Sequence, residues 1–342
     1  MTRFSLLAPR APRDTRASAP PTLSVVIAAY QAAGTVGEAI ESALGQTLPP
    51  LEVIVCDDGS TDEIEDAVAP YRGEIVFFRK ENGGEASAKN AAARAATGDF
   101  VVILDADDLF LPERLGALSE LARERPDLDI LTTDAYLEVD GAVVQRCYTS
   151  SYRFVVDDQR RGILRENFIF GHAAVRRDRL LAVGGFDEEI RWTTDWDCWL
   201  RMILNGSRAG LVEEPLSRYR LHVGSLSSQR EKHIAGRLMT LRKAAIRPDL
   251  TDEEREVVKS SIDFNRRTLA LARARAAILE GRRDARRRAL EVAVAPGHSL
   301  PTRLRAAGAA LAPGFARRRL AAKPRETTGG ILLPPTPAGE EL

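Results

Sequence analysis

Residues 101–109, with the sequence VVILDADDL, constrain the fold more than any other stretch of the chain. The four leading apolar residues are typical of a buried strand, and Asp105, Asp107 and Asp108 stand where that strand ends. Because unpaired charge is costly to bury, these carboxylates are expected at the mouth of a sheet. Their oxygens suit Mg²⁺ or Mn²⁺, and a cation there could bind a diphosphate. The alternative for this segment taken alone is a solvated turn.

Apolar runs and helical patterns alternate along the neighbouring sequence. Strands are predicted at residues 23–29, 51–56, 75–78 and 100–104, and helices after Thr35, after Ser60 and over residues 85–96. Glu38 and Glu63 follow the first two helix starts at the spacing of a capping box. This alternation predicts a parallel α/β sheet that is covered by helices on both faces.

Acidic residues stand at the carboxyl ends of two of these strands. Asp57 and Asp58 follow the strand at 51–56, and Asp105 and Asp107 follow the strand at 100–104. In parallel α/β sheets, ligands bind outside the carboxyl ends of the strands. The sequence therefore predicts a nucleotide pocket at this edge, although residues 57–60 taken alone are more typical of a turn with a helix cap.

Seven short motifs follow one another between residues 24 and 222. They are SVVIAAY (24–30), CDDGSTD (56–62), AKNAA (88–92), LDADD (104–108), GGFDE (184–188), TDWDCWLR (194–201) and YRLH (219–222). Each motif is weak by itself. Together and in this order they resemble the signature of the family-2 glycosyltransferases, and the resemblance covers about residues 21–229.

The resemblance implies an α/β fold, namely a Rossmann-like GT-A catalytic domain with a mostly parallel central sheet. It implies a metal-dependent, inverting glycosyltransferase that uses Mg²⁺ or Mn²⁺. Such an enzyme moves a sugar from a nucleotide-diphosphate donor to a sugar, glycan or lipid-linked acceptor, in the synthesis of cell-surface polysaccharide, cell wall or glycolipid. One base and one metal imply a single displacement at the anomeric carbon.

Two other functions fit an α/β sheet with strand-end aspartates. A nucleotidyltransferase would be expected to carry a Gly-rich phosphate loop and an activating Lys near the first strand, and the sequence has neither there. A non-catalytic scaffold that binds a nucleotide sugar would be favoured by loss of Asp107 or Asp195, and both are present.

The motifs on the donor side supply candidate nucleotide contacts. Ala28 and Tyr30 follow the first strand, where an aromatic ring can stack on a base. By resemblance, Asp58 contacts a uracil-type base, and Asp57 lies nearer the backbone turn. Lys89 stands among small residues of a predicted helix and could reach the pocket, although a lone Lys is more often solvated. Lys89 stands where the family commonly has Arg. A compact ammonium group therefore takes the place of a planar guanidinium that could donate two parallel hydrogen bonds.

The metal side is predicted from the strand-end cluster and one histidine. Asp107 is expected to be the direct metal ligand, and Asp105 resembles the residue that contacts the ribose or the metal. Asp108 is expected only to cap the turn before the next helix. His222 is expected to complete the metal or phosphate site as a neutral imidazole, with a structural role as the alternative. His172 has no comparable context.

The acceptor side includes the predicted catalytic base. Asp195 opens a helix whose Trp196 and Trp199 are expected to pack into the fold. A helix start lowers the pKa of a carboxylate, so Asp195 is expected to be a weak but reliably ionised base. Asp187 is expected to bind an acceptor hydroxyl or to cap its turn, and Trp192 to stack on a sugar or to be buried.

The net charge of zero conceals an asymmetry along the chain. Residues 21–229 contain 21 Lys and Arg against 35 Asp and Glu, and residues 230–342 contain 24 against 13. We therefore predict a disordered arm at 1–20, an acidic catalytic domain at 21–229, a basic helical extension at 230–323 and a disordered tail at 324–342. Helices are expected at 234–247 and 252–288, the second with a capping box of Thr251 and Glu254.

The basic extension ends in a segment, 302–323, that mixes apolar residues with six Lys and Arg. It is expected either to contact an anionic membrane surface or to pack as a solvated helical face on the core. Nucleic acid is not an expected partner, because the basic residues lack interleaved aromatics.

Targeting signals and cysteine usage favour the cytoplasm. No stretch approaches 18 uninterrupted apolar residues, and the first twenty residues lack an apolar signal core. Cys56, Cys147 and Cys198 lack metal-binding spacing and are expected to be reduced thiols. The expected location is cytoplasmic, with peripheral association at the inner face of the membrane as an extension of that prediction.

Overall fold

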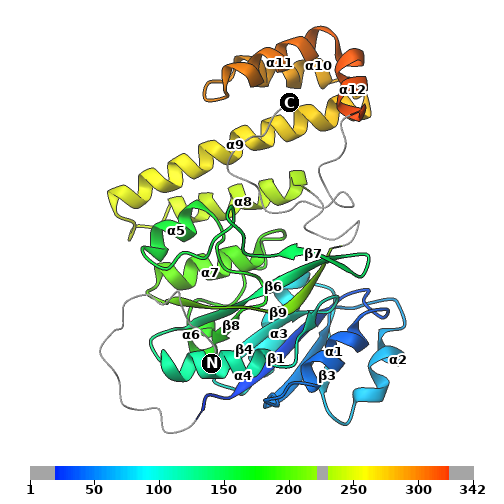
Figure 1. Cartoon of the computed structure of the whole chain (residues 1–342), viewed down its shortest axis with the longest axis vertical. Helices are drawn as coiled ribbons and strands as arrows, with labels where there is room; N and C mark the ends of the chain where they lie inside the picture. Colours follow the sequence, from blue (N-terminus) through cyan, green and yellow to red (C-terminus); the bar gives the residue numbers. More distant parts are fainter. Residues whose placement is uncertain (1–19, 222–229, 323–342) are drawn as a thin grey trace. The chain divides into compact units, whose positions relative to one another are not determined.

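The computed structural model describes residues 20–221 and 230–322 (Figure 1). The chain divides into two compact units, Met1–Leu221 and His222–Leu342. The predicted arm, apart from Pro20, and the predicted tail lie outside the described residues. Within the described ranges, every helix is too short or too polar to cross a membrane.

The first unit is a sheet with helices packed on it. Its strands are β1 (Leu23–Ala29), β2 (Glu52–Asp57), β3 (Val76–Arg79), β4 (Phe100–Asp105), β5 (Leu109–Phe110), β6 (Ile130–Val139), β7 (Ala142–Arg146), β8 (Ala174–Arg176) and β9 (Ala209–Leu221). Its helices are α1 (Val36–Leu44), α2 (Ile64–Val68), the 3₁₀ turn Ala69–Tyr71, α3 (Glu85–Ala95), α4 (Arg114–Glu124), α5 (Gln159–Arg165), α6 (Arg177–Ala182) and α7 (Thr194–Leu204).

Strand directions divide the sheet into a parallel part and a mixed part. The strand order is β3-β2-β1-β4-β8-β6-β9-β5, and β7 pairs with β6. The first four strands pair in parallel, whereas β8 is antiparallel to both β4 and β6. Because β9 is parallel to β6, strands β1–β4, β6 and β9 share one direction, and β5, β7 and β8 oppose it. The predicted mostly parallel α/β sheet is confirmed.

The register of β1 brings the strand-end residues together. Ala28 pairs with Cys56 on β2 and with Asp105 on β4, and Ala29 pairs with Asp57. The carboxyl ends of β1, β2 and β4 therefore meet at one edge of the sheet, as the sequence predicted. Cys56 is buried in its strand, and all three cysteines are free thiols.

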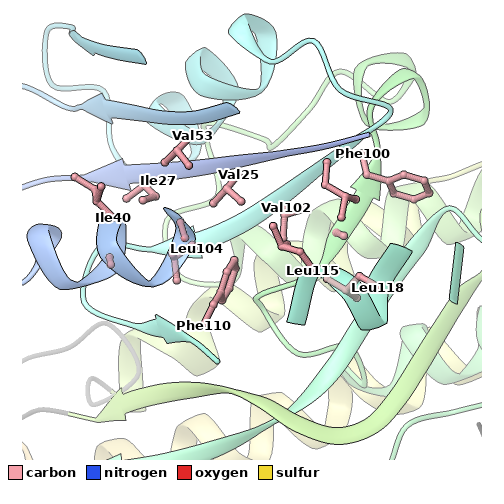
Figure 2. Packing of buried hydrophobic residues seen from close by; sticks show 14 of the residues in the cluster. Val25, Ile27, Ile40, Val53, Phe100, Val102, Leu104, Phe110, Leu115 and Leu118 are labelled. Atoms are coloured by element: carbon pink, nitrogen blue, oxygen red, sulfur yellow. The ribbon is translucent and has the colours of Figure 1, made fainter. Parts of the chain in front are cut away.

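One face of these strands forms the core shown in Figure 2. Side chains alternate along a strand, so Val25 and Ile27 of β1 face the same side as Val102 and Leu104 of β4. Helices α1 and α4 cover this face with Ile40, Leu115 and Leu118 among others. Burial of each such side chain contributes about 1.5–3 kcal/mol, and this anchors the strands whose ends carry the acidic residues.

Within residues 20–221, neither predicted capping box forms. The Thr35 hydroxyl donates instead to a backbone carbonyl of the preceding turn, and α2 begins after Glu63. Ser60 Oγ donates to Asp57 Oδ1 (2.5 Å) and accepts from the Gln31 amide (2.9 Å). Because these contacts with other segments engage the Ser60 hydroxyl, it is not available to a helix start.

The second unit is helical. It contains α8 (Arg230–Ala245), α9 (Asp252–Glu280), α10 (Ala285–Val294), α11 (Leu300–Leu311) and α12 (Pro313–Ala322). The capping box of Thr251 and Glu254 is confirmed, with N–H···O distances of 3.2 Å and 2.9 Å. The single helix predicted at 252–288 was wrong, because Gly281 adopts φ +68° and ends α9.

Candidate active site

A buried lysine joins α3 to the end of β4. Lys89 is almost fully buried, and its Nζ lies 2.9 Å from Asp105 Oδ1 and 2.5 Å from Glu85 Oε1. Burial acts to lower the pKa of Lys89, but the two carboxylates raise it above its ordinary value. Burial likewise acts to raise the pKa of Asp105, and Lys89 lowers it. Lys89 is therefore a charged member of the site, and the alternative of a solvated surface lysine is wrong.

A second buried pair lies beside Asp105. His172 Nε2 lies 2.7 Å from Asp108 Oδ2 and 3.8 Å from Asp105 Oδ2, and Asp108 Oδ1 accepts from the Arg220 amide (2.7 Å). Burial lowers the pKa of His172 to about 3, so the imidazole is neutral and donates to Asp108 through Nε2. The expectation that Asp108 only caps a turn was wrong, since it ties the β4 end to His172 and to β9.

The sequence reasoning overlooked His172. It lies two residues before β8, and its backbone carbonyl accepts a hydrogen bond from the buried guanidinium of Arg114. Burial lowers the pKa of Arg114 to about 9, and the guanidinium also lies 4.6 Å above the Phe110 ring. In the sequence, His172 is only a single polar residue at the start of an apolar run. A histidine in that setting is as common in structural positions as in functional ones.

Among the described residues, this pair and Asp105 form the one group that could hold a metal ion. Asp105, Asp108 and His172 each offer a ligand atom, and the three atoms lie within 4.8 Å of one another. His172 and Asp108 are fully buried and bonded to each other, whereas Asp105 and Asp107 are partly exposed. The carboxylate oxygens that a ligand can reach are therefore those of Asp105 and Asp107. The predicted ligand His222 lies outside the described residues.

The carboxylate of Asp58 orders a loop beside the β2 end. Its Oδ1 accepts from Lys80 Nζ (2.8 Å) and the Gly83 amide (3.0 Å), and its Oδ2 accepts from the Gly84 amide (2.7 Å). A carboxylate offers about four lone-pair sites, so these contacts leave acceptor capacity. Asp58 thus holds the segment that leads into α3.

Asp57 and Tyr30 differ in exposure. Asp57 is fully buried, accepts from the Ser60 amide (2.9 Å) and pairs with Arg79 (2.7 Å). It is the last residue of β2, and its carboxylate binds the turn that follows the strand. Tyr30 follows β1 directly and is 55% exposed, so its ring is free to stack on a flat ligand.

Asn90 connects α3 to the turn after α6. Its Nδ2 donates to the Phe186 carbonyl (2.8 Å), and its Oδ1 accepts from the Phe186 amide (2.7 Å). Gly185 has φ +72°, and a Cβ there would lie 2.3 Å from Asn90 Oδ1, so only glycine fits. The neighbouring Asp187 accepts from the Glu189 amide (3.0 Å), which is the capping alternative stated for it.

Asp195 is held at the start of α7. Trp196 Nε1 donates to the Ile163 carbonyl (2.8 Å), which ties α7 to α5, and Trp196 and Trp199 are buried as predicted. Asp195 Oδ2 accepts from Asn167 Nδ2 (2.9 Å). Burial raises the pKa of Asp195 to about 6, so the lowered pKa expected from its helix position was wrong. Desolvation outweighs the local field of the helix start.

The base candidate and the strand-end cluster belong to one site. After burial and the Trp196 amide, the charges of Lys89, Glu85 and Asp105 act on the pKa of Asp195. Trp192 is half-buried just before α7, and Asp197 turns away to pair with Arg201 (2.8 Å). The arrangement offers a carboxylate poised near neutral pH beside partly exposed acidic oxygens, which suits removal of a proton next to a cation and a phosphate.

The known sequences that this chain resembles include several glycosyltransferases. The family model for glycosyl transferase family 2 matches residues 24–184. An uncharacterized glycosyltransferase of Rickettsia typhi is 31% identical over 59% of this chain and 64% of its own length. The putative teichuronic acid biosynthesis glycosyltransferase TuaG of Bacillus subtilis is 30% identical over 62% of this chain and 84% of its own. The WfaP glucosyltransferase of Escherichia coli, named for UDP-Glc and a diphosphoundecaprenol-linked GlcNAc, is 25% identical over 66% and 87%.

Solved structures share the fold. TarS of S. aureus, residues 1–349, aligns over 87% of this chain and 89% of its own with a TM-score of 0.58 and 17% identity. TarS has also been solved with UDP-GlcNAc. The mannosyltransferase PcManGT of Pyrobaculum calidifontis, in complex with GDP-Man and Mn²⁺, aligns over 89% of this chain and 85% of its own with a TM-score of 0.58 and 23% identity.

Proposed function

The chain belongs to glycosyl transferase family 2, and we propose that it is an inverting enzyme that transfers a sugar from a nucleotide-diphosphate donor to an acceptor hydroxyl. The fold class, a GT-A α/β domain with a helical C-terminal region, is the one the sequence predicted. The position of Asp195 carries the proposal, because a carboxylate with a pKa near 6 lies in one site with the strand-end acidic cluster.

Asp195 acts as the general base. A base works best when its pKa lies near the working pH, since it is then ionised and still able to accept a proton. Asp195 takes the proton of the acceptor hydroxyl as the hydroxyl oxygen bonds to the anomeric carbon. The bond from that carbon to the diphosphate breaks on the opposite face, so the configuration inverts.

Asp107 and Asp105 are the residues that fit a divalent cation. Their oxygens are hard ligands at the sheet edge, and with Asp108 they carry more negative charge than Lys89 balances. Mg²⁺ or Mn²⁺ held there, with His222 as a further proposed ligand, would supply positive charge to the leaving diphosphate. PcManGT, whose structure includes Mn²⁺, shares the fold.

Five residues are proposed to form the nucleotide site, three by direct contact and two by supporting it. The exposed Tyr30 ring stacks on the base, and Asp58 uses its remaining acceptor capacity for a base N–H. Ala28 leaves space beside Asp105, its register neighbour, for the ribose. Asp57 contributes through the turn that it holds, and the buried Lys89 through its ion pair with Asp105.

The acceptor side is proposed to include Asp187 and Trp192. Both lie on the segment between α6 and α7 that leads to Asp195. The names of WfaP and TuaG point to a diphosphoundecaprenol-linked sugar and to teichuronic acid, respectively. We extend these to an acceptor that is a sugar, glycan or lipid-linked saccharide of cell-surface polysaccharide, cell-wall or glycolipid synthesis.

The second unit supports contact with an anionic membrane surface. Leu300, Leu304 and Leu311 recur on one side of α11 and are 66%, 63% and 82% exposed, and Phe315 of α12 is 69% exposed. Residues 300–322 contain five arginines and no acidic residue. Exposed apolar side chains among basic ones are typical of segments that lie in the headgroup region. We propose a cytoplasmic enzyme, peripheral on the inner face of the membrane, that meets a lipid-linked acceptor there.

The reaction is tested by identifying the leaving group. Nucleotide sugars with uridine, thymidine and guanosine bases are first ranked by the rise in melting temperature that they cause with Mn²⁺. The best donor is then incubated with saccharide and lipid-linked acceptors, and the phosphate products are separated. Release of nucleoside diphosphate with a β-configured product from an α-linked donor is expected. Pyrophosphate would identify a nucleotidyltransferase, and binding without turnover a scaffold.

A further inference from the structure

Asn167 lies in the loop between α5 and β8 with both ends of its amide engaged. Its Nδ2 donates to Asp195 Oδ2 (2.9 Å), and its Oδ1 accepts from the Ile169 amide (3.2 Å). Because a backbone N–H can only donate, it fixes Oδ1 toward the loop and leaves Nδ2 pointing at the carboxylate. The orientation of the amide is therefore set by the backbone.

The loop that carries Asn167 is itself held in place. The Tyr148 hydroxyl donates to the Phe168 carbonyl (3.0 Å) and accepts from the Phe170 amide (3.1 Å). The Tyr148 ring stacks on Tyr152 with centroids 5.2 Å apart and planes within 2°. A donor on a loop that is anchored at two nearby residues, Phe168 and Phe170, can constrain the group it binds.

We propose that Asn167 is a positioning residue for the catalytic carboxylate, and that its hydrogen bond to Oδ2 sets how Asp195 faces the acceptor hydroxyl. This inference rests on the proposed role of Asp195 as the base. The helix alone does not fix the carboxylate, since its side-chain torsions remain free. A shift of about 1 Å in a reacting group can cost on the order of 10²-fold in rate.

The same hydrogen bond acts on the ionisation of Asp195. The charged or titratable groups around the carboxylate are Glu85 and Lys89 of α3, Asp105 of β4, Tyr152 after β7 and Cys198 of α7. Burial and the two carboxylates favour the protonated form of Asp195, whereas Lys89 favours the ionised form. A hydrogen bond donated to a carboxylate also favours its ionised form. Loss of the Asn167 donor is therefore expected to move the acidic limb of the rate profile to higher pH.

The test compares two variants of Asn167 with a matched pair at the other end of α7. Asn167→Ala removes the donor, and Asn167→Asp keeps the shape but places two carboxylates in contact. Asn205, whose Nδ2 donates to the Arg201 carbonyl (2.8 Å), supplies the controls Asn205→Ala and Asn205→Asp. The full chain is assayed for kcat and KM from pH 5 to 9, with donor binding measured separately.

In Asn167→Ala, kcat at pH 6 is expected to fall by about 10–100-fold with little change in donor affinity. The acidic limb is expected to move upward, and further in Asn167→Asp, because two adjacent carboxylates share a proton. The Asn205 controls are expected to keep the wild-type profile. A fall that is equal at every pH, or an unchanged kcat, would overturn the positioning role.

A readout without turnover separates this inference from the proposed function. Carbon-13 NMR of protein labelled at the aspartate carboxyl follows Asp195 directly, and Asp195→Asn identifies its signal. The pKa of Asp195 is expected to rise in Asn167→Ala even if the donor sugar is unknown. Full turnover in Asp195→Asn would refute the base assignment, whereas an unmoved Asp195 titration in a folded Asn167→Asp would refute the role of Asn167.

Discussion

The packing of the first compact unit differs from that of α9, α10 and α11 in the second. The largest fully buried side chains, among them Trp196, Trp199 and Arg114, belong to the first unit. The clusters at the ends of α9, α10 and α11 consist largely of alanine, and the leucines of α11 are left exposed. Large interlocking side chains can hold a carboxylate such as Asp195 against the cost of desolvation. Where α9, α10 and α11 pack through alanines, the leucines of α11 stay at the surface, where they can contact a binding partner.

The largest effect is expected at the base in the first unit. Asp195→Asn keeps the shape but removes the group that accepts the proton, and general-base contributions are about 10²–10⁴-fold. Single-turnover transfer should therefore fall by that order while donor affinity changes little. Asp197→Asn is the comparison, because Asp197 lies on the same helix but its carboxylate is engaged by Arg201. Near-normal transfer by Asp195→Asn would assign the base to another carboxylate.

One substitution made in both units tests the contrast in packing. Leu118 of α4 is fully buried, and Leu311 of α11 is 82% exposed. Leu118→Ala is expected to lower the free energy of unfolding by about 2–5 kcal/mol, because a cavity remains. Leu311→Ala is expected to change it by less than about 0.5 kcal/mol. Denaturant titration of both variants checks this, and a large loss in Leu311→Ala would mean that α11 packs on another surface.

Local patterns were enough to predict the elements that carry the site. The first strand was predicted at 23–29, the bounds that β1 has, because an uninterrupted apolar run is readable without partners. The helix predicted at 85–96 is α3, and the Thr251 box forms as predicted, whereas the Thr35 box of the same spacing does not. The positions of these strands and helices were therefore readable from neighbours in sequence, whereas the cap at Thr35 and the end of α9 were not.

Contacts between distant segments were not predictable in the same way. Ser60 fits a capping box, but its hydroxyl is taken by Asp57 and by Gln31 from another strand end. The Asp108–His172 pair joins residues 64 positions apart. The helix-start rule gave the wrong direction for the pKa of Asp195, because burial depends on which segments cover it. The roles of the site residues therefore stay predictions, while the positions of those within the described ranges are observed.

The exposed face of the second unit is expected to respond to charge removal. Each basic residue near an anionic membrane contributes about 1 kcal/mol, so replacing Arg317, Arg318 and Arg319 together by Ala should weaken vesicle binding by on the order of 100-fold. The matched control replaces exposed arginines of the first unit, Arg72, Arg153 and Arg179. Co-sedimentation with vesicles rich in anionic lipid, at low and high salt, measures both. Equal loss in the two triple variants would mean that the attraction is not specific to α12.

Metal dependence is expected to centre on Asp107 at the β4 end. Asp107→Ala is expected to reduce the affinity for the nucleoside diphosphate by about 10–100-fold in the presence of Mn²⁺, and a chelator should do the same to the unsubstituted protein. Asp99→Ala is the control, because the exposed Asp99 precedes the same strand at its opposite end. Calorimetry in both conditions decides the point, and affinity that is indifferent to Mn²⁺ would contradict a cation at this edge.

The smallest expected effect is on stability, because the ionised carboxylate of Asp195 lowers the free energy of unfolding of the first unit. Burial raises the folded-state pKa of Asp195 to about 6, above its ordinary value of 3.8, so the ionised carboxylate disfavours the folded state. That penalty is complete above the folded pKa and is lost as pH falls from about 6 to 3.8, where the unfolded chain also takes up the proton. Allowing for partial exposure, we expect Asp195→Asn to raise the free energy of unfolding at pH 7.5 by about 1 kcal/mol, with a smaller gain at pH 4.5.

Asp263→Asn, at an exposed position of α9, serves as the control in the second unit and should show no such trend. Denaturant titrations of both variants at the two pH values check this. If Asp195→Asn were no more stable than the unsubstituted chain at pH 7.5, the ionised carboxylate would not lower the free energy of unfolding, which would contradict the prediction.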